Sequence, residues 1–167
     1  MSRNKTALAS AAVAVGLGAW PVALAAQPAA ATAHTRAQMR PQAHAAAGPA
    51  TISLRKTKLG MILVNARGFT VYAFGKDAKG QSRCAAIEGC TAIWPMVKSS
   101  GRPRAGKGVK RSLLATIKVG SATQVTYAGH PLYTYSGDGF KGSTSYIGIR
   151  QFGGTWSGLR ASGATVK

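Results

Sequence analysis

The chain has 167 residues, enough for one domain or two very small ones. It carries 22 Lys and Arg residues against 3 Asp and Glu residues, a formal net charge of +19. So few carboxylates exclude a carboxylate-rich Ca²⁺ or Mg²⁺ site and argue against a two-carboxylate glycosidase. Two cysteines exclude a Cys₄ metal site. With 21 glycines in the chain, long helices are not expected.

Residues 1–25 have the pattern of a signal peptide. Arg3 and Lys5 precede an uncharged, small-residue apolar run over 6–20, and 23–25 reads Ala-Leu-Ala, which fits the cleavage rule. The run is short for a membrane span, so a retained N-terminal anchor is the second interpretation. No cysteine follows the run, so lipidation is not expected there. We therefore predict a secreted or extracytoplasmic protein that associates with the cell envelope.

Residues 26–50 are mainly Ala, Gln, Pro, Thr and His, with two arginines and no aromatic residue. Such a segment cannot bury enough apolar surface to offset its chain entropy, which predicts a disordered linker. The folded domain is then expected over 51–167.

An internal duplication runs through this domain. Residues 64–80 resemble 125–142 at an offset of 61 without a gap, and the tryptophans that follow match at an offset of 62. The matched pairs are Gly68 and Gly129, Tyr72 and Tyr133, Asp77 and Asp138, and Trp94 and Trp156. We predict two repeats, about 60–101 and 121–163, joined by a basic loop.

Each repeat has the pattern of a hairpin. Residues 59–65 and 69–74 flank one Gly turn, and 122–127 and 131–135 flank the other. Further strands are expected over 144–149 and 155–160. The spacing of apolar residues favours a helix over 112–119, with a strand as the alternative. The pattern predicts an all-β fold, a small sandwich or barrel built from two pseudo-symmetric hairpin repeats.

Both repeats contain the pattern Tyr-x-aromatic-x-x-Asp. Because strand positions two apart share a face, the two aromatic side chains of each copy are expected to point the same way. The Asp then falls in a turn, where it can accept backbone N–H groups or a Tyr hydroxyl. The alternative is a symmetric site where the two aspartates converge across a pseudo-twofold axis. The motif residues are Tyr72, Phe74 and Asp77 in the first repeat and Tyr133, Tyr135 and Asp138 in the second.

These residues resemble the Yx(FWY)xxD motif of a family of predicted secreted lipoproteins, also described as a secreted repeat of unknown function. The resemblance covers about 58–163 and includes Cys84, Cys90 leading into Trp94, and the run 124–133. It implies an exported, repeat-built domain. It supplies no established reaction, so no catalytic residue is carried over. The chain departs from lipoprotein members in lacking the lipidated cysteine.

Cys84 and Cys90 enclose five residues, and in an exported protein the expected state is a disulfide. The loop is short, so the entropic model predicts about 2 kcal/mol of stabilisation. A redox-active pair and metal or haem ligation are the alternatives. His130 is read as a turn residue. A triad of His130, Asp138 and a serine can be drawn, but no nucleophile-elbow motif supports it.

A run of cations without an acid spans 98–118 and contains glycines and a proline typical of a loop. A charge run of this kind is often only a solvated face. Here the excess of cations over the whole domain favours binding of polyanions that weakens with salt. The candidate polyanion-binding residues are Lys98, Arg102, Arg104, Lys107, Lys110 and Arg111.

Three functions follow from these observations. The leading one is a non-catalytic, envelope-associated binding module for anionic polymers or lipid head groups, with no physiological role for nucleic acid. The second is a small-ligand, haem or metal site between the repeats, contacted by Tyr72, Tyr133, His130 and the two aspartates. The third is a hydrolase of envelope polymers that uses Asp77 and Asp138. We predict no catalytic residue, metal site or cofactor, and the sequence does not indicate an oligomeric state.

Overall fold

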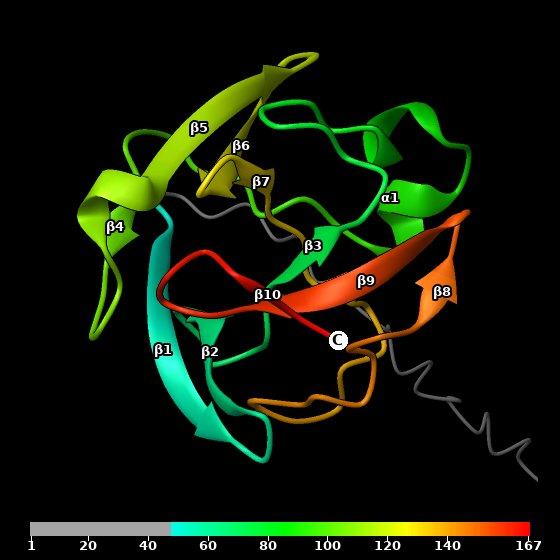
Figure 1. The fold of residues 1–167 in the computed structure, drawn as a ribbon. Helices are drawn as coiled ribbons and strands as arrows, with labels where there is room; N and C mark the ends of the chain where they lie inside the picture. Colours follow the sequence, from blue (N-terminus) through cyan, green and yellow to red (C-terminus); the bar gives the residue numbers. More distant parts are fainter. Residues whose placement is uncertain (1–47) are drawn as a thin grey trace, which may run out of the picture. The chain divides into compact units, whose positions relative to one another are not determined.

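The computed structural model describes residues 48–167, which form an all-β domain (Figure 1). The fold class predicted from the sequence is confirmed. The predicted signal peptide and most of the predicted linker lie outside the described residues. Of that linker, Ala50 is bonded into the domain, because its N–H donates to the Ser99 hydroxyl at 2.9 Å. No helix in the described part is long and apolar enough to span a membrane.

The strands form three small antiparallel sheets with one parallel pairing. One sheet has the order β2-β1-β4, the second β10-β9-β3 with β8 also paired to β9, and the third β5-β6-β7. The strands are β1 (Thr51–Thr57), β2 (Gly60–Asn65), β3 (Tyr72–Phe74), β4 (Arg104–Ala105), β5 (Leu114–Val119), β6 (Ala122–Tyr127), β7 (His130–Pro131), β8 (Arg150–Gln151), β9 (Gly154–Leu159) and β10 (Thr165–Val166). The helical turns are η1 (Cys84–Ala86), α1 (Cys90–Ile93) and η2 (Arg111–Leu113).

Each repeat begins with a long hairpin, β1–β2 in the first and β5–β6 in the second. Both hairpins have six cross-strand pairs, from Ile52↔Asn65 to Thr57↔Gly60 and from Leu114↔Tyr127 to Val119↔Ala122. The two hairpins therefore correspond residue for residue at an offset of 62. The gapless sequence alignment used an offset of 61, which shifts these strands by one residue relative to the structural match. The reason is that the turn between Asn65 and Gly68 is one residue longer than the turn between Tyr127 and Gly129. The strand β1, which alternates apolar and polar residues, was missing from the predicted elements.

Two predicted elements are wrong. The helix favoured over 112–119 is absent. Residues 114–119 form the strand β5, which was the alternative prediction for this segment. Full pairing with β6 overrides the helical spacing of its apolar residues. Residues 144–149 form turns rather than a strand, and the strand that follows is β9, close to the predicted 155–160.

Reciprocal contacts join the Gly turn of each repeat to the Asp turn of the other. Gly142 N–H donates to the Gly68 carbonyl at 2.8 Å, and Gly80 N–H donates to the Gly129 carbonyl at 2.9 Å. Gly68 and Gly129 have φ of +85° and +84°, a region that glycine adopts without strain. A Cβ on Gly129 would also lie 2.8 Å from the Lys79 side chain. Glycine thus allows both the turn and the approach of the opposite repeat.

The hydrophobic interior has two clusters, each containing residues from both repeats. The first is mainly aliphatic and contains equivalent pairs from the two hairpins, such as Ile52 with Leu114 and Leu63 with Val125. The second is aromatic and contains the disulfide, Tyr72, Tyr133 and both of the repeat tryptophans. Burial of this shared apolar surface holds the repeats together.

Candidate functional site

Tyr72 and Tyr133 lie opposite each other where the two repeats meet. Each N–H donates to the other's carbonyl, at 2.8 Å from Tyr72 and 3.0 Å from Tyr133. Both side chains are fully buried. This reciprocal pair marks the pseudo-twofold relation between the repeats.

The two motif aspartates bind the tyrosine of the opposite repeat. The Tyr133 hydroxyl donates to Asp77 Oδ2 at 2.8 Å, and the Tyr72 hydroxyl lies 3.1 Å from both carboxylate oxygens of Asp138. Asp77 also accepts the Arg83 N–H at 2.7 Å, as a turn-stabilising Asp does. In the described structure no contact joins the two carboxylates. The motif therefore makes two separate Tyr–Asp contacts, rather than the single convergent site considered from the sequence.

Burial sets the ionisation of these pairs. Desolvation raises the pKa of both the Asp77 and the Asp138 carboxyl above the ordinary value, although the Tyr hydroxyls partly oppose that shift. Desolvation and the neighbouring carboxylate also raise the pKa of Tyr72 and Tyr133, so these hydroxyls remain protonated donors. Each pair therefore joins a phenol donor to an Asp side chain whose pKa burial has raised.

The two repeat tryptophans stack on each other beside these pairs. The ring centroids of Trp94 and Trp156 are 3.8 Å apart and the planes differ by 2°. Each Trp also packs edge-on against the Tyr of its own repeat. Trp156 stacks with Phe74 of the other repeat, and Trp94 packs against Tyr135 of the other repeat with the rings tilted by 43°. All six aromatic positions of the duplicated pattern therefore belong to one packed cluster, which accounts for their presence in both repeats.

The two tryptophans differ in the hydrogen bonding of their indole nitrogens. Trp94 Nε1 donates to Gln151 Oε1 at 2.7 Å, whereas the buried Trp156 Nε1 has no partner. The residue five positions before Trp156 is Gln151, but the residue five positions before Trp94 is Gly89, which has no side chain to accept. The role of Gln151 was not predicted from the sequence.

Cys84 and Cys90 form a disulfide, as predicted from their spacing in an exported protein. Both cysteines are buried in the aromatic cluster. The bond connects η1 to α1 just before Trp94 and so fixes the segment that delivers this ring. Its position in the packed cluster gives it a structural role.

The candidate contacts of a ligand between the repeats are already engaged. Tyr72, Tyr133 and the two aspartates bond to one another, and among the described residues no three His, Cys, Asp or Glu side chains are grouped as metal ligands. His130 lies at the start of β7, where burial and the nearby Lys79 lower its pKa. It makes no hydrogen bond to Asp138, so the drawn triad is not assembled in the described structure.

The predicted polyanion-binding cations are all exposed, while the backbone that carries them is anchored. Lys107 accepts a hydrogen bond from Leu54 N–H through its carbonyl, and Lys110 N–H donates to the Tyr127 hydroxyl. The exposed side chains are Lys98, Arg102, Arg104, Lys107, Lys110 and Arg111, with Lys118 close in sequence. The segment contains no acid, and two of the three acids of the chain are bound to buried tyrosines elsewhere.

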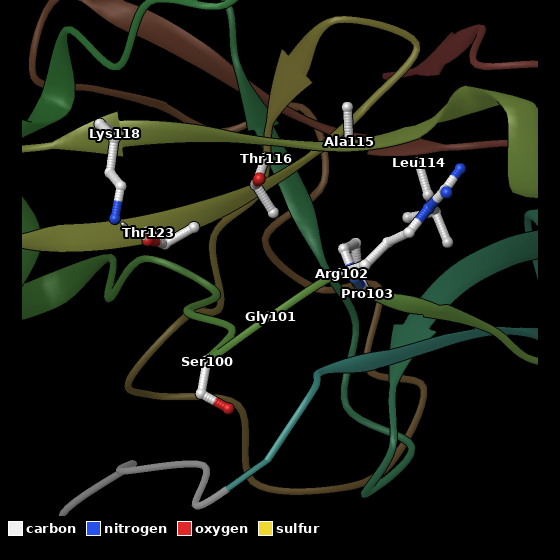
Figure 2. A pocket seen from close by; sticks show the side chains of 9 residues that line it. All are labelled: Ser100, Gly101, Arg102, Pro103, Leu114, Ala115, Thr116, Lys118 and Thr123. Carbon is white, nitrogen blue, oxygen red and sulfur yellow. Dashed lines mark hydrogen bonds between the residues drawn. The ribbon is translucent and has the colours of Figure 1, made fainter.

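A groove of about 630 Å³ lies between this segment and the face of β5 (Figure 2). Arg102 and Lys118 supply its positive charge, and Lys118 Nζ donates to the Thr123 hydroxyl at 2.9 Å. The sequence did not indicate this groove, because Lys118 and Thr123 face the loop only once β5 and β6 have paired. Its walls are formed by residues 100–103 and 114–116, Lys118 and Thr123.

Fold and site define a class of protein: an all-β, disulfide-containing domain whose two repeats interlock through Tyr–Asp pairs and stacked tryptophans. The comparison with protein families agrees with this description. Residues 53–98, which span the first repeat, match the model of a family described as a secreted repeat of unknown function. This is the family that the motif resembles. No curated protein and no solved structure matches the chain.

Proposed function

We propose that this protein is a secreted, non-catalytic binding module that contacts anionic polymers of the cell envelope through its basic surface. The observation that carries the proposal is the run over 98–118, whose cations are exposed and which contains no Asp or Glu. The described domain contains 18 Lys and Arg residues and only three acids, of which Asp77 and Asp138 are bound to buried tyrosines.

The physical basis is long-range attraction followed by local contact. A surface of one sign draws an oppositely charged polymer toward it, and the attraction falls as salt screens it. Near an anionic surface each Lys or Arg contributes about 1 kcal/mol, so several cations suffice for retention. The anchored backbone keeps these cations spaced along one segment, which suits a partner with repeated negative charges.

Export supports polymers over nucleic acid as the partner. The matched family is described as secreted, and the anionic polymers of an envelope include teichoic-type chains and acidic polysaccharides. The engaged state of the Tyr–Asp pairs supports a binding role over a hydrolase that uses Asp77 and Asp138, because both carboxylates are committed to holding the repeats together.

The test is binding of the purified mature protein to isolated cell envelopes across a salt series. One variant changes five cations of the run to Gln, and a matched control changes five exposed cations elsewhere. The run variant carries substitutions at Arg102, Arg104, Lys107, Lys110 and Arg111, and the control carries them at Lys56, Lys58, Lys76, Arg150 and Lys167. Because both variants have the same net charge, a difference between them reports the location of the contact.

We expect wild-type binding to fall steeply with salt and the run variant to bind at least roughly tenfold more weakly than the control. Equal weakening of both variants would assign the effect to net charge alone and overturn the proposed location. Salt-insensitive binding would overturn the polyanion mechanism. Retention on envelopes stripped of polymer but not of lipid would identify lipid head groups as the partner instead.

A further inference from the structure

The outer edge of β1 is covered by another strand. β4 runs parallel to β1 with the pairs Thr51↔Arg104 and Ile52↔Ala105. The Gly106 N–H donates to the Ile52 carbonyl at 2.7 Å, and the Leu54 N–H donates to the Lys107 carbonyl at 3.0 Å. The first hairpin is thereby completed into a three-stranded sheet.

The outer edge of β5 is open in the described structure. At the offset of 62, Ile52 corresponds to Leu114 and Leu54 to Thr116, so Leu114 C=O and Thr116 N–H should point away from β6. β5 pairs only with β6, and no backbone hydrogen bond joins this edge to another described segment. The segment that would correspond to β4 is β10, and β10 pairs with β9 instead.

The open edge lies at the groove described above. The residues whose backbone groups point outward, Leu114, Thr116 and Lys118, also line the groove. In Figure 2 the Lys118 side chain reaches Thr123 of β6, whereas Ala115 points away from residues 100–103. The groove volume of about 630 Å³ is within the usual range of ligand pockets. Thr123 of β6 also lines the groove, so the groove lies over the face of the β5–β6 hairpin and borders the open edge. A strand added beside β5 would therefore place alternate side chains on the face that carries the groove.

The charge of the groove selects the occupant. Arg102 and Lys118 line it, and no acid does. A second copy of this domain would bring its own excess of cations and be repelled. A polypeptide strand with acidic side chains fits both the backbone edge and the positive walls.

We propose that the outer edge of β5 is a strand-addition site for an extended, acidic polypeptide segment, which takes on the second repeat the place that β4 takes on the first. Main-chain hydrogen bonds to Leu114, Thr116 and Lys118 hold the segment, and alternate acidic side chains face Arg102 and Lys118. By the equivalence with β4, the added strand runs parallel to β5. This inference goes beyond the proposed function, because it depends on backbone pairing rather than on charge alone.

The test uses an end-blocked hexapeptide of alternating Glu and Val and the same peptide methylated on alternate backbone nitrogens. Binding is followed by amide NMR titration and by hydrogen exchange at Thr116 and Lys118. The variant Thr116→Pro removes the outward N–H while keeping every charge, since proline is tolerated in edge strands. Thr116→Val removes the hydroxyl, keeps the N–H and serves as the matched control.

We expect the unmethylated peptide to bind the wild type and Thr116→Val, with slowed exchange at Thr116 and Lys118. Binding should weaken at least about tenfold for Thr116→Pro and for one of the two methylated registers on the wild type. The methylated peptides keep the test valid even if Thr116→Pro does not fold. Absence of binding, or equal binding of all peptides, would overturn strand addition and leave β5 as an edge protected by Lys118. Neither result bears on envelope binding, which the five-cation variant tests separately.

Discussion

The first repeat covers the outer edge of its long hairpin with β4, whereas the second repeat leaves the same edge of β5 open beside a basic groove. Where the repeats meet, the contrast disappears: the Tyr–Asp pairs, the tryptophan stack and the Gly-turn contacts are all reciprocal. Packing therefore constrains the residues at the junction in both copies. Residues at the periphery are less constrained, so one copy can close an edge that the other keeps available.

The largest expected effect comes from breaking the shared centre. Trp156→Ala and Trp94→Ala should each lower the free energy of unfolding by about 3–5 kcal/mol, because each leaves a cavity in a fully buried aromatic cluster. Thermal or denaturant unfolding measures the loss. Phe140→Ala, at a side chain that is 62% exposed, is the control and should change stability by less than about 0.5 kcal/mol. A small loss at only one tryptophan would show that the two copies do not share the centre equally.

An intermediate effect should come from the disulfide, which only the first repeat contains. Replacing Cys84 and Cys90 together by Ala should cost about 2 kcal/mol through the short loop that the bond closes. Amide hydrogen exchange should then quicken mainly around η1 and α1. Equal quickening across β5 and β6 would mean that the bond stabilises both repeats and not one.

The smallest effect concerns pH. Because the folded pKa of Asp77 is raised above the ordinary 3.8, the folded state takes up this proton before the unfolded state does. The contribution of Asp77 to stability therefore increases as pH falls through the raised folded pKa toward 3.8. The melting temperature of wild type minus that of Asp77→Asn should therefore rise between about pH 6 and about pH 4.

His130 has the opposite pH trend, but it is present in both proteins. Its contribution therefore cancels in the difference between the melting temperatures of wild type and Asp77→Asn. The pKa of His130 is lowered in the folded state, so its contribution is lost as pH falls below the ordinary value of 6.5. A wild-type minus Asp77→Asn difference that falls on acidification would contradict the raised pKa. The corresponding difference for Asp138→Asn should show the same sign, because burial is the first cause at both sites.

Much of the fold could be predicted from the sequence because the duplication repeats local signals. Gly turns, paired aromatics and a turn Asp predicted hairpins in both copies, and two cysteines in an exported chain predicted the disulfide. Strand register could not be read this way, because one extra residue in the turn after Asn65 moves the offset from 61 to 62. The strand β5 was placed second to a helix because pairing with β6, rather than its own periodicity, decides its conformation.

The sequence predicted which residues make up the candidate site, but not how they are arranged in space. The cation run was visible as a string of Lys and Arg residues, and its exposure follows from its charge. The sequence did not show that Tyr72 binds the Asp of the other repeat, because the two residues are 66 positions apart. Nor did it show the groove, because its walls come from residues 100–103, β5 and β6, which only the folded chain brings together.

The reciprocal contacts between the Gly and Asp turns have a consequence for how this architecture could be assembled. The Gly turn of each repeat contacts the Asp turn of the other, so both repeats use the same surface in the contact. This is how an isologous interface is built in a closed twofold dimer. The chain therefore resembles a twofold dimer whose two halves are covalently joined, so that their association is intramolecular and does not depend on protein concentration. Fusion also frees the halves from being identical, so that an edge sealed in one half can remain a docking position in the other.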